Sequence, residues 1–113
     1  MELFLYKAVI ERVVDGDTYD ATIDLGFRMY SKLRLRLKDV DTPETWRPTT
    51  EAEAQHGAQA TAFVKDKIEG KQILIRSHKA GIYNRWEADI ILSDGSDLGQ
   101  LLIDNNLIKL DKY

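Results

Sequence analysis

Two stretches of the chain alternate between apolar and polar residues, and this pattern limits the possible folds more than any other feature. In residues 18–25 the odd positions are apolar and the even positions are polar. Residues 32–38 repeat the pattern, with leucines at the odd positions and lysines or arginines at the even ones. A period of two is typical of a β-strand with one buried face. Gly26 lies between the two stretches and predicts a chain reversal.

The flanking segments predict further strands and two helices. Residues 3–14 are rich in Val, Ile, Leu and aromatic residues, so they predict the first strand of a three-stranded meander. Thr50-Glu51-Ala52-Glu53 matches a capping box and predicts the start of a helix, which Gly70 is well placed to stop. Residues 72–77 and 86–92 predict two more strands, and Asp97 is expected to cap a short last helix.

The order of these elements predicts the fold class. A helix inserted after the third of five antiparallel strands is the layout of an OB-type barrel. The expected fold is therefore α+β, a five-stranded antiparallel OB-fold β-barrel with two helices. The chain has 113 residues, which suits a single compact domain over its whole length.

Composition and charge exclude several classes of protein. The chain has no cysteine, which excludes a disulfide scaffold and a zinc site with cysteine ligands. The first residues do not resemble a secretory signal, and no apolar run approaches the roughly 18 residues of a membrane span, so a cytoplasmic location is expected. The net charge of −3 argues mildly against a protein that coats nucleic acid. It is compatible with an enzyme that holds one phosphate, since a divalent cation would offset several carboxylates.

Three polar clusters lie beside the predicted strands. Asp15-Gly16-Asp17-Thr18 forms a strand–turn–strand junction, Arg36 precedes Asp41-Thr42-Pro43-Glu44, and Tyr83-Asn84-Arg85 comes just before a strand. Singly, each has an ordinary structural interpretation, as a turn, a solvent-facing strand residue or a hairpin tip. Their occurrence together, in order and at one end of the same predicted barrel, favours a functional site.

The carboxylates in these clusters suit phosphodiester hydrolysis. That reaction needs a hard cation, a positioned water molecule and positive charge around the transition state. Calcium or magnesium could take oxygen ligands from Asp17, Asp41 and a backbone carbonyl near Thr42. Glu44 could orient or deprotonate the water molecule.

Two arginines complete this set. Arg36 and Arg85 carry forked donors that match phosphate oxygens, and they keep their charge at any working pH. A glycosidase that uses Glu44 and an Asp as acid and base is another possibility. The arginines argue against it, because positive charge lowers the pKa of the proton donor that a glycosidase requires.

Together, the three clusters resemble the signature of the staphylococcal nuclease (thermonuclease) family. The stretch from His56 to Phe63 is also similar to the first helix of that family, and the resemblance extends over roughly residues 9–109. It implies an OB barrel and a nuclease with one calcium ion. It also implies cleavage of the 5′ P–O bond in DNA and RNA, which leaves 3′-phosphate ends.

The resemblance also implies a role for each matching residue. Asp17 and Asp41 would be carboxylate ligands of the metal, Thr42 a backbone-carbonyl ligand, Glu44 the water-activating residue, Arg36 and Arg85 the transition-state cations, and Tyr83 a neighbour of the substrate phosphate. Ile82 stands where the family often has lysine, and Lys79 is close enough in the sequence to replace that contact. Magnesium is a possible alternative to calcium, since both accept this ligand set.

Other expectations concern partners and the competing function. We expect a monomer that acts on DNA, RNA or both, prefers single strands and has no membrane partner. A groove with few basic residues should not hold a rigid duplex well. The alternative is a non-catalytic OB-fold module that binds nucleic acid or protein, although the complete catalytic set argues against it. Trp46 and Trp86 are predicted to be packing groups rather than base-stacking platforms.

Overall fold

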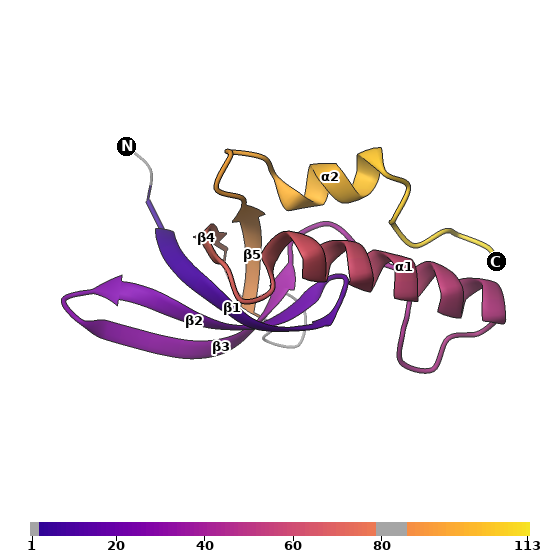
Figure 1. The fold of residues 1–113 in the computed structure, drawn as a ribbon, viewed down its shortest axis with the longest axis horizontal. Coiled ribbons are helices and arrows are strands. Elements are labelled where there is room, and N and C mark those ends of the chain that lie inside the picture. Colours follow the sequence, from indigo (N-terminus) through magenta and orange to yellow (C-terminus); the bar gives the residue numbers. More distant parts are fainter. Residues whose placement is uncertain (1–2, 79–85) are drawn as a thin grey trace.

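The computed structural model describes residues 3–78 and 86–113, and their elements follow the order expected from the sequence (Figure 1). The described elements are β1 (Leu5–Asp15), β2 (Thr18–Gly26), β3 (Met29–Leu37), α1 (Glu51–Ile68), β4 (Gln72–Ser77), β5 (Trp86–Ile91) and α2 (Leu98–Asp104). The strands close a barrel in the order β1-β2-β3-β5-β4, with β4 paired to β1. This confirms the predicted α+β barrel with two helices.

One strand pairing corrects the expectation of a wholly antiparallel barrel. β3 and β5 run parallel, with Leu35 opposite Trp86 and Leu37 opposite Ala88. The other four pairings of the barrel are antiparallel. The reason is geometrical, because a closed ring with an odd number of strands cannot reverse direction at every step.

The alternation in β2 and β3 builds one side of the core, as expected. Tyr19, Ala21 and Ile23 are buried inside the barrel and pair with Leu35, Leu33 and Ser31 of β3. Leu25 was expected to continue this buried row but is exposed. A register shift between Asp24 and Gly26 marks the point where the hairpin extends past the barrel (Figure 1). β3 also begins at residue 29, earlier than the predicted start at residue 32.

Helix α1 begins where the capping box predicted. Thr50 caps it, because its hydroxyl accepts a hydrogen bond from the Glu53 amide at 3.1 Å. The return bond of the box differs, since the Glu53 carboxylate accepts from the Thr49 amide at 2.7 Å instead of from Thr50. The buried face of α1 consists of Glu53, Gly57, Ala60, Val64 and Ile68.

The two helices lie on the same side of the molecule in Figure 1. α1 packs against β1 and α2 packs against β5. Asp97 caps α2, as predicted, by accepting a hydrogen bond from the Gln100 amide at 3.1 Å. Among the described residues, neither helix is long and apolar enough to cross a membrane.

The two tryptophans contradict their predicted role as packing groups. Trp46 is 75% exposed and Trp86 is 52% exposed. Trp46 lies in the connection between β3 and α1, where the Arg47 guanidinium lies 5.6 Å from the centre of its ring. Trp86 shares the register of the buried Ala88 and Ile90, but it is the first residue of β5 and stays half exposed at the end of the strand.

Candidate active site

The connection between β1 and β2 is a tight turn whose conformation is fixed by its own side chains. The Asp15 carboxylate accepts a hydrogen bond from the Asp17 amide at 3.1 Å, as aspartates in turns commonly do. The Tyr19 hydroxyl donates to the Gly16 carbonyl at 2.6 Å, and the Tyr19 ring is fully buried in the barrel. The turn is therefore anchored to the core rather than left free in solvent.

This turn packs directly against the segment that follows β3. A Cβ atom on Gly16 would lie 2.7 Å from the Thr42 hydroxyl oxygen, so only glycine allows the present approach. The Thr42 amide donates to the Asp17 carboxylate at 3.0 Å, and the Leu37 amide donates to the Asp17 carbonyl at 2.9 Å. Two of the three clusters found in the sequence thus meet at one end of the barrel.

Arg36 links the two aspartates of this site. Its guanidinium lies 3.5 Å from the Asp17 carboxylate and forms a closer ion pair with Asp41. Asp17 is 6% exposed, and its pKa is raised to about 6, mainly by burial and secondly by the neighbouring Asp15. The Thr42 amide and Arg36 act in the opposite direction. The fold therefore holds a desolvated carboxylate that Arg36 only partly compensates.

Glu44 lies at the edge of the cluster, where helix α1 supports its backbone. A Cβ atom on Gly57 would lie 2.7 Å from the Glu44 carbonyl and 2.9 Å from the Pro43 carbonyl. The missing side chain at Gly57 thus lets the helix approach this segment closely. The Glu44 side chain is exposed, with its carboxylate 3.7 Å from the Lys109 ammonium.

Lys109 is a residue of this site that the sequence did not suggest. Its ammonium lies between the carboxylates of Glu44 and Glu53, 3.8 Å from the latter, and its amide donates to the Asp41 carbonyl at 2.8 Å. A lone lysine after the last helix carries no sequence signal, because the contact depends on how the C-terminal segment returns to the barrel. Lys109 is thus placed to position both Asp41 and Glu44.

The oxygen atoms at this end of the barrel could supply some, but not all, of the ligands of a hard cation. Asp17 and Asp41 offer carboxylate oxygens close to one another, and the burial of Asp17 favours a compensating positive charge. No group of three or more His, Asp or Glu side chains placed to hold a metal occurs among the described residues. A cation bound here would therefore need backbone carbonyls and water to complete its ligands, which calcium accepts.

Three predicted site residues lie outside the described residues: Arg85, Tyr83 and Lys79. Their roles stay predictions. The described chain resumes at Trp86, which pairs with Leu35, the residue before Arg36. Of the other predicted residues, Asp17, Arg36, Asp41 and Thr42 come together through the contacts above, and Glu44 joins them through Lys109.

Comparisons with known proteins identify two similar proteins and a family. The chain is 26% identical over 113 residues to the Staphylococcal nuclease domain-containing protein 1 of Schizosaccharomyces pombe, covering 96% of this chain and 12% of that protein. It is 29% identical over 107 residues to Endonuclease YhcR of Bacillus subtilis, covering 88% of this chain and 8% of that protein. The chain thus spans about a tenth of the length of these relatives. The model of the staphylococcal nuclease homologue family matches residues 34–110, so the chain belongs to this family.

Proposed function

We propose that this chain is a metal-dependent nuclease that hydrolyses phosphodiester bonds in DNA and RNA. The observation that carries the proposal is the meeting of the buried Asp17 with the half-buried Arg36 and the exposed Asp41 at one end of the barrel. Membership of the staphylococcal nuclease homologue family and similarity to a protein named as an endonuclease support a nuclease or nucleic-acid-binding role. We further propose calcium as the cofactor, with magnesium as an alternative, and 3′-phosphate product ends.

The metal would be held by Asp17, Asp41 and the backbone carbonyl of Thr42. A hard divalent cation, when bound, polarises a phosphoryl oxygen and neutralises part of the phosphate charge. The Arg36 guanidinium contacts the carboxylates of both Asp17 and Asp41 and so offsets the repulsion between them. The same guanidinium, with its forked donors, is suited to bind the substrate phosphate once a cation compensates the aspartates.

The protein's own residues supply the proton transfer and the remaining positive charge. Glu44 accepts a proton from the attacking water, whose oxygen bonds to phosphorus while the bond to the 5′ oxygen breaks. The departing 5′ oxygen takes a proton from solvent, and Arg85 is proposed to donate a hydrogen bond to it. The Lys109 ammonium, 3.7 Å from the Glu44 carboxylate, orients that carboxylate. Arg36 stabilises the extra negative charge of the transition state.

A non-catalytic nucleic-acid-binding module is the second candidate function. It is favoured by the small number of carboxylates at the site. Among the described residues only Asp17 and Asp41 contact Arg36, and no group of three acidic or histidine side chains is placed to hold a metal. Such a module would bind nucleic acid without metal and would never cut it. The two candidates therefore differ in metal dependence as well as in turnover.

The deciding experiment measures cleavage of single-stranded DNA and RNA with calcium, with magnesium and with chelator. Glu44→Gln should remove most of the turnover, about 10²-fold or more, because general base catalysis is worth roughly that factor. Glu51→Gln, an exposed acid in the first turn of α1, serves as the matched control and should cut like the wild type. Products should resist 3′ extension by a polymerase until a phosphatase is added. Binding without cleavage in any metal would favour the second candidate.

A further inference from the structure

The hairpin of β2 and β3 presents apolar side chains to solvent beyond the end of the barrel (Figure 1). Phe27 at its tip is 98% exposed, and Tyr30 is 64% exposed. Leu25 and Met29 flank the tip and are also exposed. Large apolar side chains gathered at a protruding tip cost solubility and mark surfaces that contact a partner. We name residues 25–32 the hairpin arm.

The backbone at the tip is strained for the side chains that it carries, which lowers the stability of the turn. Gly26 and Met29 pair, and the two residues between them have positive φ angles, 54° at Phe27 and 61° at Arg28. Both angles lie in the left-handed region, which makes this a type I′ turn. Such turns favour Asn-Gly, since other side chains are strained in this conformation. The conformation of the turn therefore does not explain why phenylalanine and arginine occupy positions 27 and 28.

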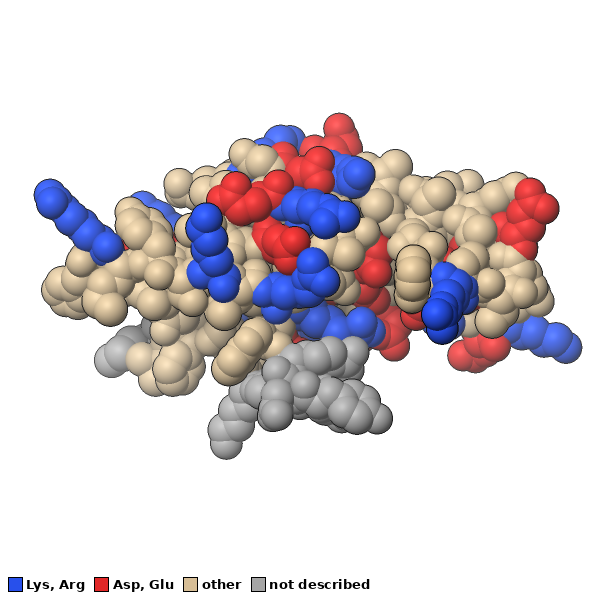
Figure 2. All heavy atoms as spheres, turned by 90° about the horizontal axis from the view of Figure 1, so that it is seen from below, with Lys and Arg blue, Asp and Glu red and all other residues tan. Residues whose placement is uncertain are grey.

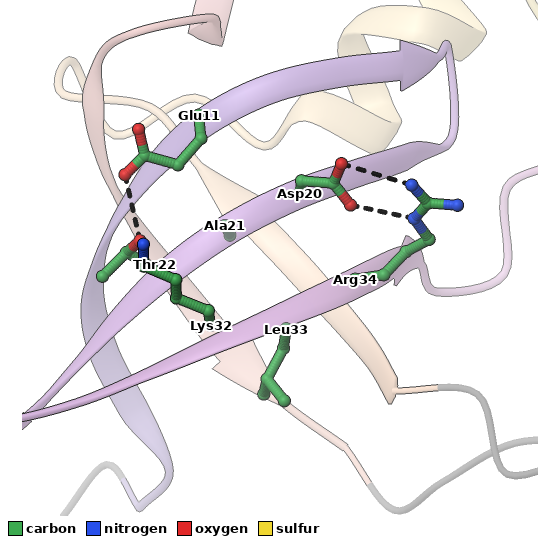
Figure 3. Close-up of a pocket in the computed structure, with 7 residues that line it drawn as sticks. All are labelled: Glu11, Asp20, Ala21, Thr22, Lys32, Leu33 and Arg34. Carbon is green, nitrogen blue, oxygen red and sulfur yellow. Dashed lines mark hydrogen bonds and ion pairs between the residues drawn. The ribbon is translucent and has the colours of Figure 1, made fainter.

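Basic side chains accompany the aromatic ones and continue toward the candidate active site. Lys32, Arg34 and Arg36 occupy alternate positions of β3, so they share its outward face. Figure 3 shows Lys32 and Arg34 at a shallow hollow of about 350 Å³ on this face. From Tyr30 to Arg36 a strand of this length extends roughly 20 Å, which links the arm to the site.

The acidic side chains on the same face make hydrogen bonds within the protein, and Asp20 is also paired with a cation. Asp20 forms a bidentate pair with Arg34, at 2.8 Å and 3.2 Å, and Glu11 accepts from the Thr22 hydroxyl at 3.0 Å (Figure 3). Asp24 accepts from the Gly26 amide at 2.9 Å.

Two cations of the hairpin arm are left for a partner. Within the described part of the chain, Arg28 and Lys32 take part in no ion pair. Figure 2 shows basic groups along this face from the hairpin end toward the middle of the molecule, interspersed with acidic ones. Arg28 and Lys32 are thus available to a ligand next to the aromatic side chains of the arm. The exposed Lys7 and Arg12 of the neighbouring β1 add to this positive charge.

We propose that the hairpin arm binds the single-stranded nucleic acid that enters the active site. Phe27 and Tyr30 stack on bases, and Arg28 and Lys32 hold the phosphates beside those bases. Exposed aromatic rings interleaved with cations are the combination that binds single strands without reading their sequence. This inference rests on the proposed function for the identity of the ligand, and it adds a binding site remote from the scissile phosphate.

Association of the arm with a second copy of the chain is less well supported. Among the described residues, β3 pairs only with β2 before Leu35, which leaves one edge open. Lys32 and Arg34 on this strand would bring like charges together if two such edges paired, which is how proteins commonly prevent that contact.

The test measures binding of a labelled single-stranded oligothymidylate by fluorescence anisotropy, in chelator so that nothing is cut. The double variant Phe27→Asn/Arg28→Gly gives the turn its preferred residues, so its Tm should equal or exceed that of the wild type. Its affinity should be about tenfold weaker or worse, since loss of one stacked base and one phosphate contact is expected to have at least that effect. Ile103→Gln, which removes an exposed apolar side chain from α2, is the control.

Lys32→Ser tests the phosphate contact separately. It should lower the slope of log affinity against log salt by about 0.7, as expected for one lost contact to a single strand. Lys65→Ser on α1, an exposed lysine of the same charge, should leave affinity and slope unchanged.

Several outcomes would overturn the inference. They are unchanged DNA affinity in the double variant, or absence of DNA binding by the wild type. A third is a double variant that keeps its binding to DNA but loses the wild type's binding to phosphatidylserine vesicles, measured in parallel. If the wild type binds through the arm but cuts nothing with calcium or magnesium, the arm stands and the nuclease proposal fails. If it cuts normally and the arm variants bind and cut like the wild type, only the arm is refuted.

Discussion

At the scale of single residues, the site depends on a glycine that lets two segments touch. A Cβ atom on Gly16 would lie within 2.8 Å of three atoms of the Thr42 side chain, which is itself buried. Thr42 is branched and buried, so it cannot move aside cheaply. We predict that Gly16→Ala destabilises the fold by about 1–3 kcal/mol, as overpacking usually does. Urea unfolding would measure this, and metal affinity should fall with it because the contact between Thr42 and Asp17 is displaced.

The same contact provides its own control. Thr42→Ala removes two of the three colliding atoms, so the double variant Gly16→Ala/Thr42→Ala should be more stable than the sum of the single effects predicts. Strictly additive effects would show that Gly16 is not constrained by Thr42.

At the scale of elements, the start of α1 should make stability depend on acidic pH. Glu53 accepts from the Thr49 amide and hydroxyl, which lowers its pKa below the ordinary value of 4.5, with Lys109 contributing. The unfolded chain therefore binds more protons between the two pKa values, so the stabilisation is present above about pH 4.5 and is lost as pH falls through the folded pKa. The difference in Tm between wild type and Glu53→Gln should be largest near pH 6 and smaller at pH 3.

The strands also show which parts of the fold could be predicted from the sequence. The alternation at residues 18–25 and 32–38 predicts β2 and β3, because one buried face imposes a period of two. The early start of β3 is not predictable from turn signals, since Phe27 and Arg28 occupy positions that normally favour Asn-Gly.

Part of the site could be predicted from the sequence and part could not. Asp17, Arg36 and Asp41 could be predicted as neighbours, because each lies at or near the end of a strand. The contribution of Lys109 does not follow, since its contacts to Glu44 and Asp41 join segments far apart in the chain.

At the scale of the whole molecule, the strands form a closed barrel, and the two proposed binding places lie at opposite ends of it. The turn between β1 and β2 and the segment after β3 meet at the site, while the opposite hairpin carries the arm. Binding at either place should therefore change the stability of the one cooperative unit that both belong to.

This coupling gives the last prediction, which concerns metal removal. At pH 7, above both the ordinary pKa of Asp17 and its value of about 6 in the fold, the buried carboxylate is ionised and costs stability. Without metal, Asp17→Asn should raise stability by about 1–3 kcal/mol, because the amide needs no compensating charge and still accepts from Thr42. Calcium at a hundred times its Kd should stabilise the wild type by about 2.7 kcal/mol and so raise its Tm. It should not raise the Tm of the variant. The Tm advantage of the variant in chelator should thus shrink or reverse when chelator is replaced by calcium. If calcium shifted both equally, Asp17 would not be a ligand.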